Sequence, residues 1–523
     1  MSLSRRSFLT ASGLAVSAGL TVPTSARALS STGLSSGSSL FQGFLPSRPE
    51  ITHGVATGDM RADGALVWTR SDRPARMVVE TAATEDFNNA RRFVAKQALT
   101  PETDGTGRVR LTGLEAGQDV HYRVTLEDLT TGAASEPVTG TFRTAPAGEE
   151  DIRFHWSADV AGQGYGINPD MDGMIGWSAM AARSPQFFLH SGDSVYSDNP
   201  IEAEVKLEDG RIWRNITSDA KSKVAETLDE FRGQYAYNLM DKHYLEFNRQ
   251  VPQLMQWDDH EVSNNWYPGE ILDDPRYTIE KNADVLSARG FQAFHEWQPL
   301  DSTMAVDGRI YRKVSYGPLL DIFILDMRTY KDENDKHHAG DNEYGWILGD
   351  KQRDWLINEV KNSTATWKVI ANDLPLGIIM PDGDNQEGVS SGTPGEPVGR
   401  EQELAHVLTA FKDIKNVVWL TADVHYCAAH EYDPNKAAYQ DFAPFWEFVS
   451  GPLHAGGFGP NEMDPTFGPR VDFFHGPDYV NQSPLDDIQH FGEVDINAET
   501  KEFTVRFITT RGNVLYTKTL PAA

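Results

Sequence analysis

Six short apolar runs, each followed by an Asp, His or Asn side chain, constrain the fold of this chain most strongly. Runs of this length suit strands buried in a sheet, and helical spacing recurs between them in 224–243, 284–297 and 350–360. Functional sites in open α/β sheets lie beyond the carboxyl ends of the strands. We therefore predict an α/β fold in which six strand ends share one site. The runs are 152–156, 186–189, 252–257, 319–325, 367–371 and 417–420.

The densest of these endings is Trp257-Asp258-Asp259-His260-Glu261. It brings three carboxylates and an imidazole into five consecutive residues, which are side chains that bind metals and transfer protons. Buried at a strand end, such a group would need a cation to neutralise it. On the surface it would be a solvated acidic turn. The segment alone leaves both interpretations open, and the other five endings favour a site.

Length and charge exclude several classes of function. The chain has 523 residues, enough for two to four domains, and a formal net charge of −29. This acidity argues against a nucleic-acid-binding surface, which needs a basic footprint. An anionic substrate would have to be attracted locally, by metal ions or a few arginines. The single cysteine, Cys427, excludes an intramolecular disulfide and argues against a thiolate zinc site. We expect it to be a small core residue.

The first residues predict export. Ser4-Arg5-Arg6-Ser7-Phe8-Leu9 is a twin-arginine signature, a weakly apolar stretch covers 11–22, and an A-x-A cleavage site ends at residue 28. The alternative is a chance arginine pair before a short anchor. We interpret 1–28 as a signal peptide for the twin-arginine translocation machinery and 29–46 as a linker. No later run reaches the roughly 18 apolar residues of a membrane span. The expected location is periplasmic or secreted.

Two further regions follow the linker. Residues 47–147 contain short alternating segments broken by turns, which predict an N-terminal β-sandwich. Residues 148–523 contain the six runs and form the predicted catalytic domain. Within it, 374–400 is rich in Gly, Pro and Asp and is interpreted as a lid or rim. Segments between 491 and 517 predict terminal strands that close a second sheet.

The strand endings supply a set of candidate metal ligands in which oxygen donors dominate. Such a set suits hard or borderline ions such as ferric iron, Mn, Zn, Mg or Ca. Two metals about 3.5–4 Å apart need a bridging carboxylate, and they clamp the attacking and leaving oxygens in hydrolysis. The candidates are Asp159, Asp193, Tyr196, Asp259, His260, Asp423 and His425.

Several segments in this order resemble the PhoD-type alkaline phosphatases of the calcineurin-like metallophosphoesterase superfamily. They include 191–196 (SGDSVY), 257–261 (WDDHE) and 421–426 (TADVHY). Further matches are 53–59 (HGVATGD), 325–330 (LDMRTY), 348–356 (LGDKQRDWL) and 448–452 (FVSGP). The resemblance runs over nearly the whole chain, and it is the combination of segments that is specific.

The resemblance implies a β-sandwich before a four-layer αββα metallophosphoesterase domain that holds two or more metal ions, Fe³⁺ and Ca²⁺ in family members. Asp193 would be the bridging carboxylate and Tyr196 a phenolate ligand to the ferric ion, unless Tyr196 is only a packing aromatic. Asp259 would be a ligand, and Asp423 and His425 would complete the set.

The resemblance also implies how phosphate is handled. The nucleophile would be a metal-bound hydroxide, and His260 would stabilise the phosphoryl group or protonate the leaving group. Arg328 and Arg232 are candidates for binding the phosphate, because a guanidinium fork suits it. Asn265 would either contact the phosphate or cap the following segment. Ser194 as a covalent nucleophile is a rival mechanism.

One position departs from the family pattern. Where the family usually has Cys at the end of the first catalytic strand, this chain has Asp159. A carboxylate in place of a thiolate leaves the iron in doubt and allows Mn or Zn. The predicted function is an exported metal-dependent alkaline phosphatase acting on phosphomonoesters, phosphodiesters or both. The alternatives are a phospholipase D-like phosphodiesterase and a non-catalytic exported protein that binds phosphate or metal.

Overall fold

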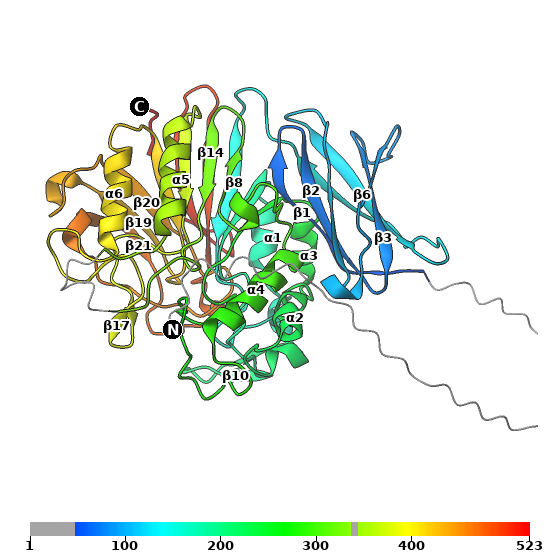
Figure 1. Cartoon of the computed structure of the whole chain (residues 1–523), viewed down its shortest axis with the longest axis horizontal. Coiled ribbons are helices and arrows are strands. Elements are labelled where there is room, and N and C mark those ends of the chain that lie inside the picture. Colours follow the sequence, from blue (N-terminus) through cyan, green and yellow to red (C-terminus); the bar gives the residue numbers. More distant parts are fainter. Residues whose placement is uncertain (1–47, 336–343) are drawn as a thin grey trace, which may run out of the picture. The chain divides into compact units, whose positions relative to one another are not determined.

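The computed structural model describes residues 48–335 and 344–523. The predicted signal peptide and linker therefore lie outside the described residues. Within the described part, most strands belong to two large sheets (Figure 1). The first has the order β24 (Val514–Leu520), β23 (Phe503–Thr509), β22 (His490–Ile496), β8 (Ile152–Ser157), β9 (Phe187–Ser191), β12 (Gln253–Gln256), β1 (Ile51–Arg61), β2 (Gly64–Ser71) and β5 (Thr106–Arg110). The second has the order β13 (Arg312–Ser315), β14 (Leu320–Ile324), β15 (Trp367–Ala371), β18 (Val417–Thr421), β20 (Phe445–Val449), β19 (Cys427–Tyr432) and β21 (Pro469–His475).

Each of the six apolar runs is a strand, as predicted. Strands β8, β9 and β12 pair in parallel in the first sheet, and β14, β15 and β18 pair in parallel in the second. The carboxyl ends of each set therefore lie at one edge of its sheet. The terminal strands β22 to β24 differ from the prediction, because they extend the first sheet beside β8 instead of closing a second one.

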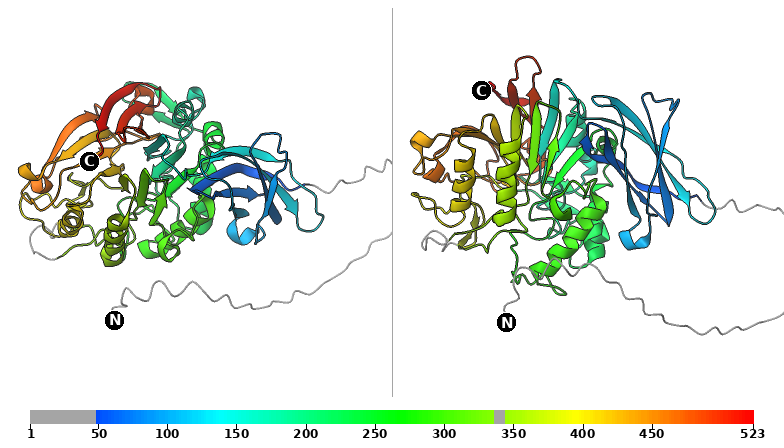
Figure 2. Two further views of the ribbon diagram at one scale, coloured as in Figure 1. Left: turned by 90° about the horizontal axis from the view of Figure 1, so that it is seen from above. Right: turned by 45° about the horizontal axis from the view of Figure 1, so that its top comes forward.

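The helices form two groups (Figures 1 and 2). In Figure 1, α5 and α6 lie together beside the second sheet, and α1 to α4 form a separate group. The predicted helix over 224–243 is two helices, because the Asp241 side chain accepts hydrogen bonds from the backbone N–H groups of His243 and Tyr244 and so caps a new one. The helices are α1 (Gly176–Ala181), α2 (Leu228–Asn238), α3 (Lys242–Asn248), α4 (Ala283–Trp297), α5 (Gly349–Asn362) and α6 (Glu401–Phe411).

Buried side chains show which element packs on which. Phe187 and Leu189 of β9 share one buried cluster with Ile322 of β14, so the two sheets pack against each other. Phe188 points the other way, into a cluster with residues of α1, α2 and α4. Phe323 points away from the first sheet, into a cluster with residues of α5 and α6. The α/β class is confirmed, and this alternation supports the predicted four layers.

The N-terminal strands form two facing sheets, but one of them continues into the larger fold. Strands β1, β2 and β5 belong to the nine-stranded sheet, where Gly58 of β1 pairs in parallel with Gln253 of β12. Their buried side chains, such as Val67, share a cluster with Val79 and Val124 of the other sheet. That sheet has the order β4 (Arg91–Val94), β3 (Ala75–Ala82), β6 (Asp119–Asp128) and β7 (Val138–Arg143). The nine-stranded sheet therefore contains strands from both sides of the predicted boundary near residue 147.

The predicted lid or rim, 374–400, is packed rather than loose. Leu374, Leu376 and Ile378 are buried in the cluster that contains α5 and α6. The segment also contains a short hairpin, β16 (Pro381–Asp382) and β17 (Asn385–Gln386).

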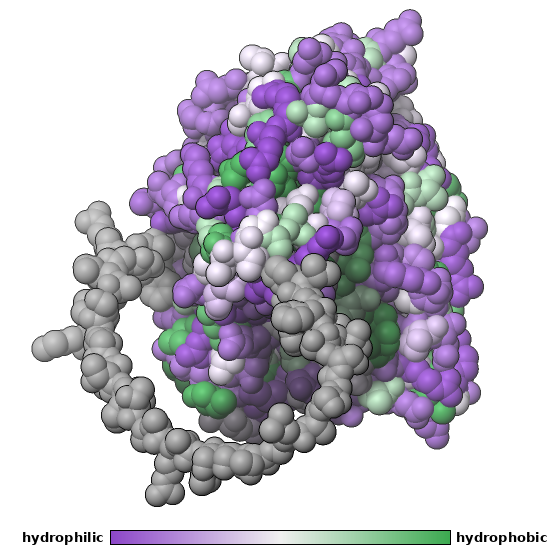
Figure 3. Space-filling view, turned by 90° about the vertical axis from the view of Figure 1, so that its right-hand side faces the viewer, coloured by the Kyte–Doolittle hydropathy of each residue, from purple (hydrophilic) through white to green (hydrophobic). Residues whose placement is uncertain are grey.

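The face drawn in Figure 3 is mostly hydrophilic. Among the helices that the structure describes, none has both the length and the apolar character needed to cross a bilayer.

A buried ion pair joins the N-terminal strands to both sheets. The Arg312 guanidinium donates to Asp59 Oδ1 from Nη2 at 2.7 Å and from Nε at 3.0 Å, and it donates to the Met255 carbonyl at 3.0 Å. Asp59 Oδ2 accepts from the backbone N–H of Asp301 at 2.6 Å. Both charged side chains are fully buried. Asp59 is the last residue of the 53–59 segment that resembles the family. The ion pair with Arg312 gives this aspartate a structural role.

We predict that Asp59→Ala lowers the free energy of unfolding by about 3–5 kcal/mol, because it leaves the Arg312 charge buried without its partner. The shift of the urea unfolding midpoint measures this. The matched control is Asp63→Ala at an exposed position nearby, which should change stability by no more than about 0.5 kcal/mol. Equal midpoints for the two variants would contradict the structural role of the pair.

Candidate metal centre and active site

The strand-end side chains converge on a single cluster. Asp159 follows β8, Asp193 follows β9, Asp259 follows β12, and both Asp423 and His425 follow β18. Three overlapping groups have ligand atoms within 4.8 Å of one another: Asp159, Asp193 and His425; Asp193, Asp259 and His260; and Asp258, Asp259 and Asp423. Because Asp193 belongs to the first two groups and Asp259 to the last two, the donors form a continuous series that has room for more than one ion.

The backbone bends sharply where it delivers these side chains. Asp159 has φ 64°, Asp193 φ 50°, Asp423 φ 67° and His425 φ 60°, all in the left-handed region. Non-glycine residues adopt this region at a cost, and such strain collects at functional sites. Aspartate tolerates the conformation better than most residues, which suits three of these four positions.

The carboxylates are short of positive charge. Both oxygens of Asp159 and Oδ1 of Asp259 lack hydrogen-bond partners among the described residues. Burial raises the pKa of Asp159, Asp193 and Asp423 well above the usual range, and the neighbouring Asp258 and Asp259 raise it further. Carboxylates held this way need a cation to stay ionised. Unpaired oxygens, one imidazole and one phenol are a donor set that fits hard or borderline metal ions.

His425 and Tyr196 are oriented toward the same cluster. His425 Nδ1 lies 2.5 Å from the Gly456 carbonyl, which can only accept, so Nδ1 carries the proton. Burial lowers the pKa of His425 to about 4, so the ring is neutral and Nε2 carries the lone pair. The Tyr196 hydroxyl donates to this Nε2 at 2.9 Å. A Cβ on Gly162 would lie 2.5 Å from the Tyr196 ring, so glycine is required for this approach.

His260 is held by a carboxylate on the loop after β9. Its Nδ1 lies 2.7 Å from Asp198 Oδ1, and Asp198 Oδ2 accepts from the backbone N–H of Asn264 at 3.0 Å. Burial acts to lower the pKa of His260, but Asp198 and Asp259 outweigh it and raise the pKa to about 9. Since Asp198 takes Nδ1, Nε2 is the nitrogen that can meet a bound group. Asp198 is absent from the predicted site, although a carboxylate two residues after Tyr196 was visible in the sequence.

Comparison with known proteins agrees with this geometry. Residues 154–507 match the PhoD-like phosphatase family, and residues 38–146 match the N-terminal domain of PhoD-like phosphatases. The chain belongs to the PhoD-like phosphatase family. It is therefore a hydrolase of phosphoric ester bonds, as predicted.

Individual relatives agree with the family match. The chain is 28% identical to alkaline phosphatase D of Bacillus subtilis over 458 residues, which cover 81% of this chain and 74% of that protein. The solved structure of PhoD has a TM-score of 0.69 at 22% identity and covers 91% of this chain and 90% of its own. A purple acid phosphatase from yellow lupin (Lupinus luteus) seeds has a TM-score of 0.57 at 13% identity, covering 91% and 75%. These two structures share the fold.

Arg328 lies in the site of this PhoD-like phosphatase, but with partners other than those predicted. The side chain is fully buried. Nε donates to Asp258 Oδ1 at 2.5 Å, Nη2 donates to Asp423 Oδ1 at 3.0 Å, and Nη1 donates to Glu387. The guanidinium that was predicted to bind phosphate is thus an internal counter-ion of the carboxylates. Glu387 comes from the 374–400 segment, which brings that segment to the site.

The two other predicted phosphate contacts are also engaged elsewhere. Arg232 on α2 donates to Glu296 at 2.7 Å and to Asp229 at 3.0 Å, neither of which belongs to the carboxylate cluster. Asn265 supports the cluster through its backbone, whose N–H donates to Asp259 Oδ2 at 2.5 Å. Its side-chain amide donates to Asp382 at 3.1 Å, in the β16–β17 hairpin. We therefore do not include Arg232 in the proposed site.

Lys331 is a buried amine beside the cluster that the sequence interpretation missed. Its side chain is 2% exposed, and its Nζ has no hydrogen-bond partner among the residues that the structure describes. Burial lowers its pKa to about 7, and the nearby Arg328 lowers it further, whereas Glu387 and Asp259 raise it. A lysine after a strand-end loop has no distinguishing pattern in the sequence, so only the fold reveals this position.

Glu261 fastens the loops after β9 and β12 together. Its carboxylate accepts from the backbone N–H groups of Asp258 at 2.8 Å and Ser194 at 2.7 Å, and more weakly from that of Asp193 at 3.3 Å. The Ser194 hydroxyl also donates to it at 2.7 Å. Ser194 is therefore a buried structural hydroxyl, which removes support from the rival covalent mechanism.

We predict that Glu261→Ala lowers stability by about 2–4 kcal/mol, because each buried donor left unpaired costs about 1–3 kcal/mol and the loops relax only in part. Urea unfolding monitored by tryptophan fluorescence measures this loss. Glu261→Gln keeps one acceptor oxygen and should lose clearly less. If Ala and Gln lower the midpoint equally, or neither does, the carboxylate does not fasten the two loops.

Proposed function

We propose that this PhoD-like phosphatase is a metal-dependent alkaline phosphatase that hydrolyses phosphomonoesters, phosphodiesters or both. The observation that carries the proposal is the continuous series of buried, partly unpaired carboxylates with His260 fixed beside it. Two or more metal ions would be held by Asp159, Asp193, Tyr196, Asp259, Asp423 and His425. When bound, they would neutralise the phosphate and activate water for attack on phosphorus.

The chain's own groups then have distinct tasks. Asp193 joins the group of Asp159 and His425 to the group that contains Asp259 and His260, and it is the proposed bridging carboxylate by family resemblance. His260, with Nδ1 fixed by Asp198, would present Nε2 to the phosphoryl group or donate a proton to the leaving group. Fe³⁺ and Ca²⁺ are the ions suggested by family resemblance. Asp159 supplies oxygen where the family usually has sulfur, which also admits Mn or Zn.

Two alternatives make different demands on the site. A phospholipase D-like phosphodiesterase would use the same metal cluster and differ in its leaving group. A non-catalytic binder of metal or phosphate would have no use for an imidazole held by its own carboxylate beside the ligands. The Asp198–His260 pair therefore favours an enzyme. Export by the twin-arginine machinery to the periplasm or medium rests on residues 1–28 alone.

We predict that His260→Ala lowers kcat for nitrophenyl phosphate by at least about 100-fold, the usual contribution of a positioned acid or base. The bound metal, measured by elemental analysis, should remain at the level of the unchanged protein. The partly exposed His243, which pairs with Asp172, provides the control variant His243→Ala with normal activity.

Asp423→Ala is the contrasting variant. It removes a proposed metal ligand, so the protein should lose both bound metal and activity. If His260→Ala keeps its activity, the assigned mechanism is wrong. A full metal complement in Asp423→Ala would remove that residue from the site.

The unpaired amine of Lys331 is the proposed phosphate contact in place of Arg232. Because a hydrogen bond to a charged group contributes about 1.5–3 kcal/mol, we predict that Lys331→Met raises KM for a phosphomonoester about tenfold or more. The effect should be larger for a monoester than for a diester, since the monoester has more negative charge. Arg232→Gln is the control and should leave KM unchanged. A rise in KM for Arg232→Gln but not Lys331→Met would restore the original assignment.

A further inference from the structure

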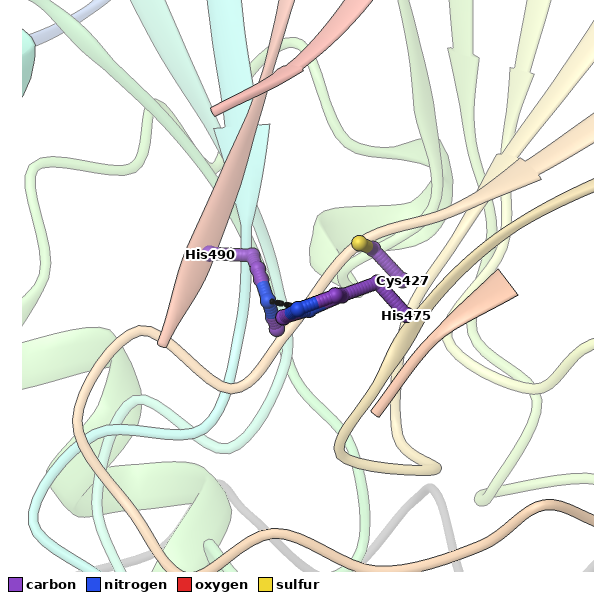
Figure 4. Close-up of side chains that lie close together, drawn as sticks. All are labelled: Cys427, His475 and His490. Carbon is purple, nitrogen blue, oxygen red and sulfur yellow. Dashed lines mark hydrogen bonds between the residues drawn. The ribbon is translucent and has the colours of Figure 1, made fainter. Parts of the chain in front are cut away.

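A second group of metal-binding side chains lies outside the carboxylate cluster. Figure 4 shows the rings of His475 and His490 facing each other, with the Cys427 side chain beside them. Cys427 begins β19 and His475 ends β21, and the two residues are paired in register in the second sheet. His490 begins β22 of the first sheet. The sulfur and two ring nitrogens lie within 4.8 Å of one another, so the group spans the two sheets.

Hydrogen bonds determine which nitrogens face the centre of the group. His490 Nδ1 faces the Gly451 carbonyl at 3.3 Å, so its proton is on Nδ1 and the lone pair is on Nε2. That Nε2 lies 2.8 Å from His475 Nδ1, which must therefore donate the proton of this bond. Transfer of the His475 proton from Nδ1 to Nε2, which gives the other neutral tautomer, would leave both facing nitrogens free to bind an ion. A carbonyl that fixes the outer nitrogen of a ligand histidine is typical of metal sites.

The surroundings suit the two imidazoles as ligands, whereas burial raises the pKa of the Cys427 thiol well above its usual range, so a bound ion would have to displace the thiol proton. Cys427 and His490 are fully buried, and burial lowers the pKa of His490 to about 3, so the ring is neutral. His475 is only half-buried, and burial lowers its pKa too. Its exposed side gives an ion a way in. A buried cysteine alone is usually a small core residue, but two imidazoles with converging nitrogens are not needed to fill a core.

We propose that Cys427, His475 and His490 bind one borderline-soft transition metal ion of the Zn²⁺ type. Zinc is bound by mixtures of thiolate and imidazole, and three protein ligands leave a fourth position for water. Sulfur and nitrogen donors distinguish this site from the oxygen-rich cluster. A single cysteine argues against an all-thiolate zinc site, but a mixed site needs only one thiolate.

The position gives the ion a structural task. His490 contacts the Gly451 carbonyl, and Gly451 packs against Asp159 so closely that a Cβ there would lie 2.1 Å from Asp159 Oδ2. An ion that fixes His490 would hold the two sheets together and brace the loop behind Asp159. The site does not depend on the proposed phosphatase mechanism.

The single cysteine makes the test specific, because any thiolate-to-metal charge-transfer band must come from Cys427. The purified full-length protein is treated with a chelator and titrated with Co²⁺. We expect a near-ultraviolet thiolate-to-cobalt band that saturates at one ion per chain and that Zn²⁺ abolishes. His475→Gln, at a half-exposed position, should remove the band while circular dichroism stays unchanged. Asp159→Asn, which alters the oxygen-rich cluster, should keep it.

Metal content provides a second measurement. Cys427→Ala should bind one ion fewer per chain than the unchanged protein, by elemental analysis after exposure to Zn²⁺. If Cys427→Ala fails to fold, alkylation of the Cys427 thiol is measured instead. Zn²⁺ should protect this thiol from alkylation in the unchanged protein but not in His475→Gln. Absence of a cobalt band in the unchanged protein, or a band that survives in His475→Gln, overturns the proposal.

Discussion

The burial of several carboxylates at one point is the constraint on which the rest of this structure depends. Like charges in a low-dielectric interior repel, and none of these groups is stable as an anion without compensation. The chain supplies part of that compensation through Arg328, which contacts Asp258 and Asp423. The unpaired oxygens of Asp159 show that this is not enough. The donor types fit metal ions. Bound ions would neutralise the carboxylates and would also supply the proposed catalysis.

The fold meets this constraint by topology. Parallel strands in two packed sheets bring distant segments to adjacent edges, and a left-handed residue after a strand turns its side chain into the cluster. Supporting contacts then fix the loops: Glu261 joins two of them, and Asp326 accepts from the Trp257 indole at 2.9 Å and so holds the start of the 257–261 segment. The packed 374–400 segment contributes Glu387, whose carboxylate accepts a hydrogen bond from Arg328. Each support is a polar group satisfied inside the protein, as burial requires.

The sequence located the strands and the side chains that gather at the carboxylate cluster better than the groups around them. Strand endings and short motifs are local, so Asp193, Asp259 and His425 could be found from order and spacing. Arg328 and Arg232 were assigned by side-chain chemistry alone, and a guanidinium suits a carboxylate as well as a phosphate. Their partners Glu387 and Glu296 are 59 and 64 residues away. Asp198 and Lys331 have no such pattern, and only the three-dimensional packing shows what they face.

The position of the single cysteine bears on the metal question. In the family pattern a cysteine ends the first catalytic strand, and here Asp159 takes that place while Cys427 belongs to a different group with His475 and His490. The oxygen-rich cluster therefore receives no sulfur from this chain, and its ions would be chosen by oxygen and a single ligand imidazole. A soft donor is instead kept behind the loop that supports Asp159. If both sites bind metal, their unlike donors favour different ions, because thiolate and carboxylate differ in softness.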